Sequence, residues 1–204
     1  EFFAEAVAFA SKRGILIAHD AAYSEMTYDG QKSPSILEIP GAKDVAIELF
    51  SLSKTYSMTG WRVGFAVGHP QAISLLAKVK SNLDSGIFQA IQIAGIAALK
   101  EGDKALERNL KIYQERRDLL ISGLNKLGFN VPLPKATFYC WIPVPPGYTS
   151  AELCLRFLEE MNIVVTPGNG FGPNGEGYFR ISLTVAESRI MEALDRIKKS
   201  HKTK

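Results

Sequence analysis

The hydrophobic residues at the start of the chain recur every three or four positions, at Phe2, Phe3, Ala6, Phe9 and Ala10. This spacing predicts an amphipathic helix, and Gly14 is typical of the residue that ends one. Three continuous apolar runs follow, at residues 15–18, 45–50 and 63–67. Runs of this length without polar positions predict short strands that are buried on both faces.

Helical spacing returns at about 71–80 and 88–99, and Asp84-Ser-Gly86 separates the two predicted helices. Between the first two strands, residues 24–44 contain two glycines and two prolines, which predict loops with one short helical turn. Strands that alternate with helices in this way are typical of an α/β sheet.

The second half of the chain has a different pattern. From 103 to 127 the apolar residues step by three and four, which predicts one long helix with an apolar stripe. Further strands are expected at 138–142, 163–166 and 178–183, and helices at about 150–161 and at the end of the chain. Two segments, Thr149–Glu152 and Thr184–Glu187, match the capping box that opens a helix.

We therefore predict two domains. Residues 1–102 form an α/β part, and residues 103–204 form a smaller α+β unit behind a long connecting helix. The chain begins inside a predicted helix and without a Met. We accordingly expect residues 1–102 to be the later part of a larger domain.

Composition indicates an ordinary globular protein, with 46% hydrophobic and 22% charged residues. The formal net charge of +3 comes in part from the terminal run 198–204, and because no basic stripe lies elsewhere we expect no nucleic-acid partner. The apolar runs are shorter than a membrane span, so no membrane partner is expected and a cytoplasmic location is the default. Cys140 and Cys154 lie among apolar residues and are expected to be small buried hydrophobes.

The candidate chemistry centres on Lys54, in the connection after the second predicted strand. Open α/β sheets bind ligands at the carboxyl ends of their strands. The hydroxyls of Ser51 and Ser53, together with Arg62, suit a phosphate group, and a lysine amine suits a Schiff base with an aldehyde. Pyridoxal phosphate carries both groups on one ring. The alternative is a polar loop with a solvated lysine.

Asp20 and Tyr23 follow the first predicted strand and so are expected at the same edge of the sheet. A carboxylate paired with the pyridine nitrogen keeps a pyridoxal ring protonated, and a phenol can hydrogen-bond its phenolic oxygen. Considered without Lys54, Asp20 would be an ordinary loop or cap residue. Arg180 lies in an apolar strand and must be paired, because an unpaired buried charge is costly, and a structural salt bridge is one explanation.

Two other patterns carry no site. Gly170-Phe-Gly172-Pro-Asn-Gly175 has the spacing of a dinucleotide fingerprint, but it contains Pro173 and leads into a predicted strand where the fingerprint requires a helix. We interpret it as a tight loop before Arg180. The three histidines, at 19, 69 and 201, lack the spacing of metal ligands, so no metal site is expected.

Ser51-Leu-Ser-Lys54, with Arg62 after it and Asp20-x-x-Tyr23 before it, resembles the fold-type I (class I/II) aminotransferases. The resemblance extends from Asp20 to Glu187. It implies part of a large domain with a mostly parallel sheet and helices on both faces, then a smaller α+β C-terminal domain. It also implies a homodimer with shared active sites.

Residue by residue, the resemblance implies that Lys54 holds pyridoxal 5'-phosphate as an aldimine and moves the proton in a ping-pong transamination. Asp20, Tyr23, Ser51, Ser53 and Arg62 would bind the cofactor, with Lys54, Asp20 and Tyr23 catalytic. Arg180, in Tyr178-Phe-Arg180, would bind the substrate α-carboxylate. Family segments that complete the site would precede residue 1, so the chain alone is expected to be inactive.

Within the family, four stretches are most similar to the bacterial LL-diaminopimelate aminotransferases: 53–62, 84–92, 136–143 and 177–180. The expected reaction is therefore amino transfer between LL-2,6-diaminopimelate and a 2-oxo acid such as 2-oxoglutarate. Animal-type aspartate aminotransferases have a second Arg near residues 85–92, where this chain has Ser85, Phe88, Gln89 and Gln92. Ser85 or Gln89 could still reach across a dimer.

Three alternatives stay open at this point. The parent protein could be an alanine- or aspartate-type aminotransferase, or a carbon–sulfur lyase of the same fold, which would need no keto acid. A non-enzymatic alternative is the pyridoxal-phosphate-sensing domain of a transcription regulator, which would need a DNA-binding segment before residue 1.

Overall fold

The computed structural model describes residues 1–202 and places them in two compact units, Glu1–Arg108 and Asn109–Lys204. The division falls inside the long helix α5 (Asp103–Lys126), a few residues beyond the predicted boundary. Each unit is described by itself. Thr203 and Lys204, the last part of the basic terminal run, lie outside the described residues.

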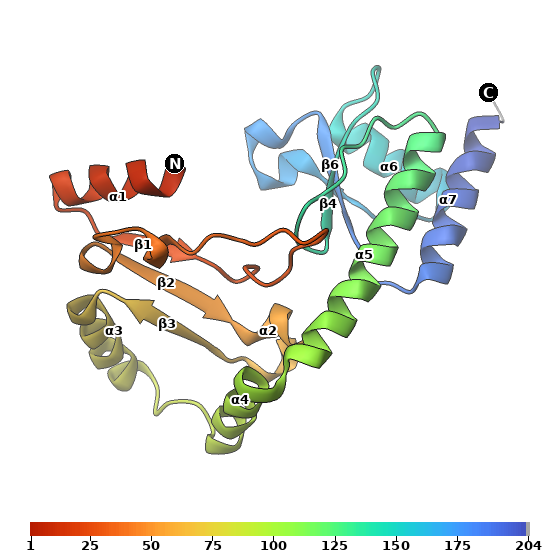
Figure 1. The fold of residues 1–204 in the computed structure, drawn as a ribbon. Helices are drawn as coiled ribbons and strands as arrows, with labels where there is room; N and C mark the ends of the chain where they lie inside the picture. Colours follow the sequence, from red (N-terminus) through yellow and green to blue (C-terminus); the bar gives the residue numbers. More distant parts are fainter. Residues whose placement is uncertain (203–204) are drawn as a thin grey trace. The chain divides into compact units, whose positions relative to one another are not determined.

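The first unit contains a three-stranded sheet with helices before and after it (Figure 1). Its strands are β1 (Ile17–Asp20), β2 (Ala46–Ser51) and β3 (Gly64–Gly68). Its helices are α1 (Phe2–Arg13), α2 (Leu52–Thr55), α3 (Pro70–Leu83) and α4 (Gln89–Glu101), and its 3-10 turns are η1 (Ile36–Glu38), η2 (Ala42–Asp44) and η3 (Thr59–Trp61). Gly14 ends α1 in the left-handed conformation, as its position predicts.

The sheet of the first unit is mixed, so the mostly parallel sheet expected for the large domain is shown only in part. β1 and β2 run parallel, but β3 pairs with β2 in the antiparallel sense. The connection after β2 holds one turn of α-helix and a 3-10 turn. Parallel neighbours are usually joined by a full crossover helix, which this connection lacks.

The core of the first unit lies between α1, η1, η2 and β2. Val7, Ile36, Ala42 and Ala46 are buried there. The prediction that the third strand is buried on both faces is wrong within this chain, because Phe65 and Val67 of β3 are exposed. β1 also begins later than predicted, because Ile15 still donates its backbone N–H to Ala10 at the end of α1.

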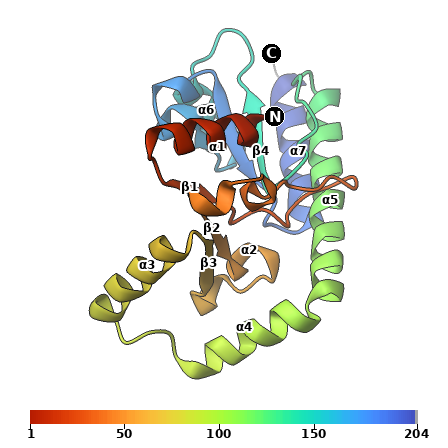
Figure 2. The same cartoon turned by 60° about the vertical axis from the view of Figure 1, so that its left-hand side comes forward.

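The second unit contains an antiparallel sheet of order β4-β6-β5 with helices packed on it (Figure 2). The strands are β4 (Tyr139–Pro143), β5 (Thr166–Pro167) and β6 (Tyr178–Ser182), and the helices beyond α5 are α6 (Ser150–Met161) and α7 (Glu187–Lys202). The turns η4 (Gly168–Phe171) and η5 (Pro173–Gly175) join β5 to β6. The strand predicted over 163–166 is reduced to the short β5.

Helix packing in this unit depends on one glycine. α5 and α7 lie side by side in both views (Figures 1 and 2), with Ile190 and Ile197 of α7 buried. A Cβ on Gly123 of α5 would lie 2.3 Å from a methyl carbon of Leu194, so the absent side chain makes room for that leucine. Cys140 and Cys154 are free and buried, as predicted, and burial raises the pKa of the Cys140 thiol to about 12.

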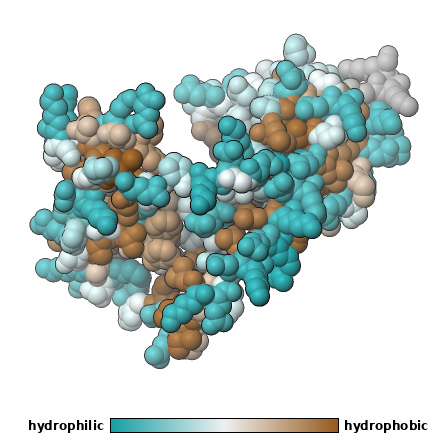
Figure 3. Space-filling view, viewed as in Figure 1, coloured by the Kyte–Doolittle hydropathy of each residue, from teal (hydrophilic) through white to brown (hydrophobic). Residues whose placement is uncertain are grey.

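Apolar side chains also reach the surface of the first unit. Figure 3 shows hydrophobic residues over α4, where Phe88, Ile93, Ile96 and Leu99 are exposed. Even so, the helices among residues 1–202 include none that is both long enough and apolar enough to span a membrane.

Candidate functional site

The parallel pairing of β1 and β2 places two chemically active segments at one edge of the first sheet. Asp20 is the last residue of β1 and pairs in register with Leu49, and β2 ends two residues later at Ser51. Asp20 is exposed, and its carboxylate accepts a hydrogen bond from the Ala22 backbone N–H at 3.2 Å. Within residues 1–202, Asp20 has no cationic partner.

Lys54 lies in α2, a single helical turn that begins directly after β2. Ser51 caps this turn, because its hydroxyl oxygen accepts a hydrogen bond from the Ser53 backbone N–H at 3.2 Å. Ser53 is buried and Lys54 is half-buried. The Lys54 Nζ atom lies 5.9 Å from the centre of the Tyr23 ring, which comes from the turn after β1. The structure thus brings together Lys54 and Tyr23, two of the residues that the sequence singles out.

Arg62 belongs to the same connection. It adopts the left-handed conformation at φ 53° and donates from Nη1 to the Thr59 carbonyl at 2.9 Å. Thr59 in turn donates from its hydroxyl to the Ser53 carbonyl at 3.1 Å. A chain of two hydrogen bonds therefore fixes Arg62 relative to the turn that carries Lys54, and the guanidinium itself stays exposed.

Tyr56, two residues after Lys54, was not singled out by the sequence. Its ring lies against Gly102, where a Cβ would come within 2.5 Å of it. Burial, with Asp103 and Glu25 nearby, raises the pKa of the Tyr56 phenol, so this hydroxyl stays protonated at neutral pH.

A buried polar cluster around Glu48 lies in the same sheet, and the sequence analysis did not predict it. Glu48 of β2 is only 1% exposed. Its carboxylate accepts hydrogen bonds from the Ser35 hydroxyl at 2.5 Å and the Ile36 backbone N–H at 3.3 Å, and it contacts His19 Nδ1 at 2.7 Å. The available signal was a single Glu inside an apolar strand. His19 also packs edge-on against the Phe3 ring.

Arg180 lies in the second unit, on β6, with its Cα in register with Trp141 of β4 and Thr166 of β5. Its guanidinium carbon lies 4.1 Å from the centre of the Tyr139 ring and 4.4 Å from that of Phe171. Its side chain makes no ion pair or hydrogen bond with the described residues, so the structural salt bridge that could explain it is not formed there. The aromatic neighbours were not predicted.

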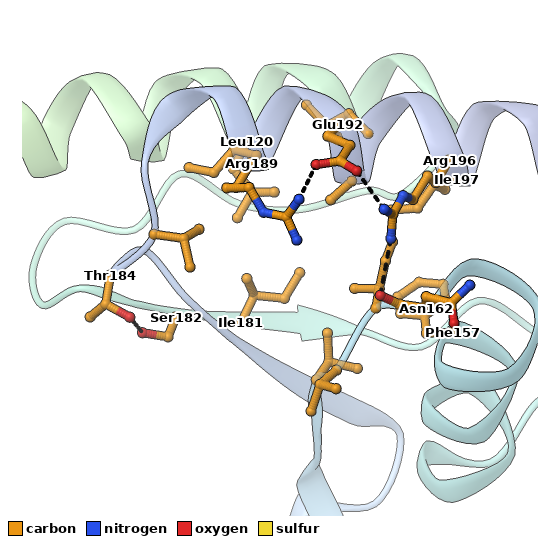
Figure 4. Close-up of a pocket in the computed structure, with 17 residues that line it drawn as sticks. Leu120, Phe157, Asn162, Ile181, Ser182, Thr184, Arg189, Glu192, Arg196 and Ile197 are labelled. Atoms are coloured by element: carbon orange, nitrogen blue, oxygen red, sulfur yellow. Dashed lines mark hydrogen bonds and ion pairs between the residues drawn. The ribbon is translucent and has the colours of Figure 1, made fainter.

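One hollow of the second unit is not lined by Arg180. A cavity of about 270 Å³ lies between α7 and the strands, lined by residues that include Leu120, Phe157, Ile181 and Ile197 (Figure 4). Its three charged groups are paired with one another, because Glu192 contacts both Arg189 and Arg196. None of the predicted site residues lines this cavity, so it is not the candidate site.

The histidines and the glycine-rich segment are the remaining patterns of the sequence. Across the residues that the structure covers, no group of three or more His, Cys, Asp or Glu could hold a metal ion. The glycine-rich segment 170–175 forms parts of η4 and η5 and leads into the strand β6, which is the context that argues against a dinucleotide fingerprint.

Comparison with known proteins identifies the family to which the chain belongs. Residues 1–197 match the model of the family "Aminotransferase class I and II". The chain is 56% identical to LL-diaminopimelate aminotransferase 2 of Trichormus variabilis, over 97% of the chain and 50% of that protein. It is 57% identical to LL-diaminopimelate aminotransferase of Maridesulfovibrio salexigens, over 98% of the chain and 52% of the relative.

Solved structures agree. Substrate-bound BacF from Bacillus subtilis superposes with a TM-score of 0.93 at 39% identity, over 98% of this chain and 51% of that one. The L,L-diaminopimelate aminotransferase of Chlamydomonas reinhardtii superposes with a TM-score of 0.85 at 34% identity. The match covers 97% of this chain and 51% of that one. The chain spans about half the length of the curated relatives that it matches. On the match to the family model, this chain belongs to the class I and II aminotransferases.

Proposed function

We propose that this chain carries the cofactor lysine and the substrate-carboxylate arginine of a pyridoxal-phosphate aminotransferase. The proposed reaction moves an amino group from LL-2,6-diaminopimelate to a 2-oxo acid such as 2-oxoglutarate. The substrate assignment is supported by the names of relatives that are 53–57% identical. The single observation that carries the proposal is the placement of Asp20, Tyr23 and Lys54 at the carboxyl edge of two parallel strands.

The side chains at this edge fit the cofactor that the family uses. Ser51 uses its oxygen as an acceptor in capping α2, so its O–H remains available to donate to a phosphate oxygen. Arg62 commits one N–H to Thr59 and keeps its other donors for the same group. Asp20, without a cation in the described chain, is available to accept a hydrogen bond from a protonated ring nitrogen.

When bound, pyridoxal phosphate supplies an electron sink for the pair released at the α-carbon of an amino acid. The proposed role of Lys54 is to attach the cofactor through its amine and, once displaced by substrate, to move the proton from that α-carbon. The Tyr23 ring lies beside the Lys54 amine and would orient that amine. Arg180 would bind the α-carboxylate that all amino-acid substrates share, through two parallel hydrogen bonds.

We also propose that the full-length protein is a homodimer. Ser85 and Gln89 are exposed near the apolar surface of α4, where Phe88 is 74% exposed. Apolar surface of this kind is typical of an interface. Sedimentation of the full-length protein at micromolar concentration would give the mass of two chains, and a monomer mass would contradict this proposal.

The test of substrate class is a steady-state panel with the full-length protein. LL-diaminopimelate, glutamate, aspartate and alanine are each supplied with a 2-oxo acid, and kcat/KM is compared. We expect LL-diaminopimelate to have the highest value. A preference for alanine or aspartate would remove the diaminopimelate assignment and leave the aminotransferase assignment. Turnover that needs no 2-oxo acid would indicate a lyase.

A further inference from the structure

The sheet of the second unit has one apolar face and one aromatic face. Along β4 and β6 the side chains alternate, so Cys140, Ile142 and Phe179 point into the buried core. The opposite face carries Tyr139, Trp141, Tyr178 and Arg180, by the same alternation. The single cation of this face is thus surrounded by aromatic side chains.

Two rings contact the Arg180 guanidinium directly. Their centres lie 4.1 Å (Tyr139) and 4.4 Å (Phe171) from its central carbon, well inside the range of cation–π attraction. Tyr139 comes from β4 and Phe171 from the turn η4, so the two rings reach the guanidinium from different elements. Arginine is the cation that stacks on aromatic faces.

The rings leave the edge of the guanidinium open. Among residues 1–202 its N–H groups have no acceptor, and no buried side-chain nitrogen is unpaired, so these donors face solvent. A guanidinium held by two rings has little freedom to turn, so its planar fork of N–H donors keeps one direction. That fork suits one planar ligand with two oxygens, which is a carboxylate.

The ring of Phe171 is itself held in place. It packs edge-on against Trp141 at 5.6 Å, and Trp141 stacks on Tyr178 at 5.6 Å. The backbone of η4, which carries Phe171, is pressed against η5, where a Cβ on Gly168 would lie 2.0 Å from the Gly175 carbonyl oxygen. Only glycine permits this approach, and the approach fixes the position from which Phe171 reaches Arg180.

We infer that Tyr139 and Phe171 are positioning residues for the carboxylate-binding arginine. They hold the Arg180 guanidinium between their rings with its donor edge towards the substrate. This inference rests on the proposed function of Arg180. It adds that two side chains with no predicted role set the affinity for the carboxylate common to the amino-acid and 2-oxo-acid substrates.

The experiment measures carboxylate binding and turnover in the full-length holoenzyme. Phe171→Leu and Tyr139→Leu each remove one ring and keep an apolar side chain. Tyr148→Leu is the matched control, because it removes a ring that contacts a different arginine of the same unit, Arg156. Phe171→Tyr is the conservative variant. Binding of 2-oxoglutarate is followed by the fluorescence of Trp141, which contacts Phe171.

Each ring-removing variant should weaken 2-oxoglutarate binding and raise both KM values about 3- to 30-fold, with kcat changed less than about threefold. The visible spectrum of the bound cofactor should not change. Phe171→Tyr and Tyr148→Leu should bind 2-oxoglutarate as the unmutated protein does. Slow turnover of an amino-acid amide, which has no carboxylate, should be unaffected by ring removal, whereas a general structural defect would lower it.

The outcomes separate the proposed role of Arg180 from the positioning role of Tyr139 and Phe171. If Arg180→Ala abolishes binding while both ring-removing variants bind normally, the inference is overturned and the proposed role of Arg180 stands. If Arg180→Ala binds 2-oxoglutarate as well as the unmutated protein, the proposed role fails and the inference with it. Because Phe171 is 52% exposed, its leucine variant is expected to fold, and thermal unfolding checks this.

Discussion

The two units position their candidate site residues by different means. At the edge of the first sheet, strand ends and backbone hydrogen bonds position the side chains. β1 ends at Asp20, and Ser51 caps the helical turn that holds Lys54. Arg62 donates a hydrogen bond to a backbone carbonyl. In the second unit, Arg180 is placed by the rings of Tyr139 and Phe171. Strand ends and caps can be identified from sequence, whereas contacts between distant side chains cannot. The predictions below test this contrast, from the largest expected effect to the smallest.

Replacing Lys54 by Ala in the full-length protein should remove covalent cofactor attachment and lower turnover by about 10⁴-fold or more, because the amine both attaches the cofactor and moves the proton. Stopped-flow and steady-state assays measure the loss. Lys43→Ala, at an exposed lysine of η2, is the control and should remain active. An active Lys54→Ala variant would contradict the role.

Replacing Asp20 by Asn should slow the proton transfer about 10²- to 10³-fold while the cofactor stays bound, because a neutral amide does not hold the ring nitrogen protonated. Single-turnover kinetics with the loaded protein measure this step. Asp44→Asn, at an exposed aspartate of the same unit, should leave the rate unchanged. Near-normal single turnovers in Asp20→Asn would refute the assignment.

Replacing Arg180 by Ala should cost about 2–5 kcal/mol in transition-state binding, as expected for removing one side of a charge pair. Arg180→Lys keeps the charge but loses the planar fork, so it should also weaken every substrate. The order of preference among LL-diaminopimelate, glutamate, aspartate and alanine should not change in kcat/KM measurements. A variant that impairs one substrate and spares the others would mean that Arg180 recognises the side chain.

The smallest effect concerns the loop before β6. Glu176 accepts a hydrogen bond from the Ser150 backbone N–H at 2.7 Å, and this bond lowers the pKa of the Glu176 carboxyl. Because the folded pKa is below the ordinary value of 4.5, the stabilising contribution is full above that value. It is lost as pH falls through the lower folded pKa.

Unfolding by denaturant at several values from about pH 6 to about pH 3 would measure this contribution. Glu176→Gln should flatten that pH dependence slightly, whereas Glu159→Gln, at an exposed position on α6, should leave it unchanged. Identical pH profiles for Glu176→Gln and the unmutated protein would contradict the assignment.

The sequence predicts most elements because apolar periodicity and caps act locally. The helix at 150–161 and its capping box at Thr149 are confirmed, and so is the helix end at Gly14. The second capping box is wrong: the Thr184 hydroxyl contacts Ser182, the Glu187 carboxylate binds Arg116, and α7 begins only at Glu187. A side chain that finds a stronger partner far along the chain no longer caps its own helix.

Local sequence patterns do not predict the direction of a strand in its sheet, nor the partners that a side chain gains from distant elements. The apolar run of β3 is compatible with either direction, and its antiparallel pairing goes with a connection after β2 that lacks a crossover helix. Glu48 and Phe171 likewise gain their roles from partners brought by other elements, His19 and Arg180. The roles assigned to Lys54, Asp20, Tyr23, Ser51, Ser53, Arg62 and Arg180 stay predictions.

The most direct test of the central claim is to find the lysine that binds the cofactor. The full-length protein, loaded with pyridoxal phosphate, is reduced with borohydride, digested and analysed by mass spectrometry. The account predicts one modified peptide, with the pyridoxyl-phosphate mass on Lys54, and its loss in Lys54→Ala. The same mass on another lysine, with Lys54 unmodified, would contradict the account.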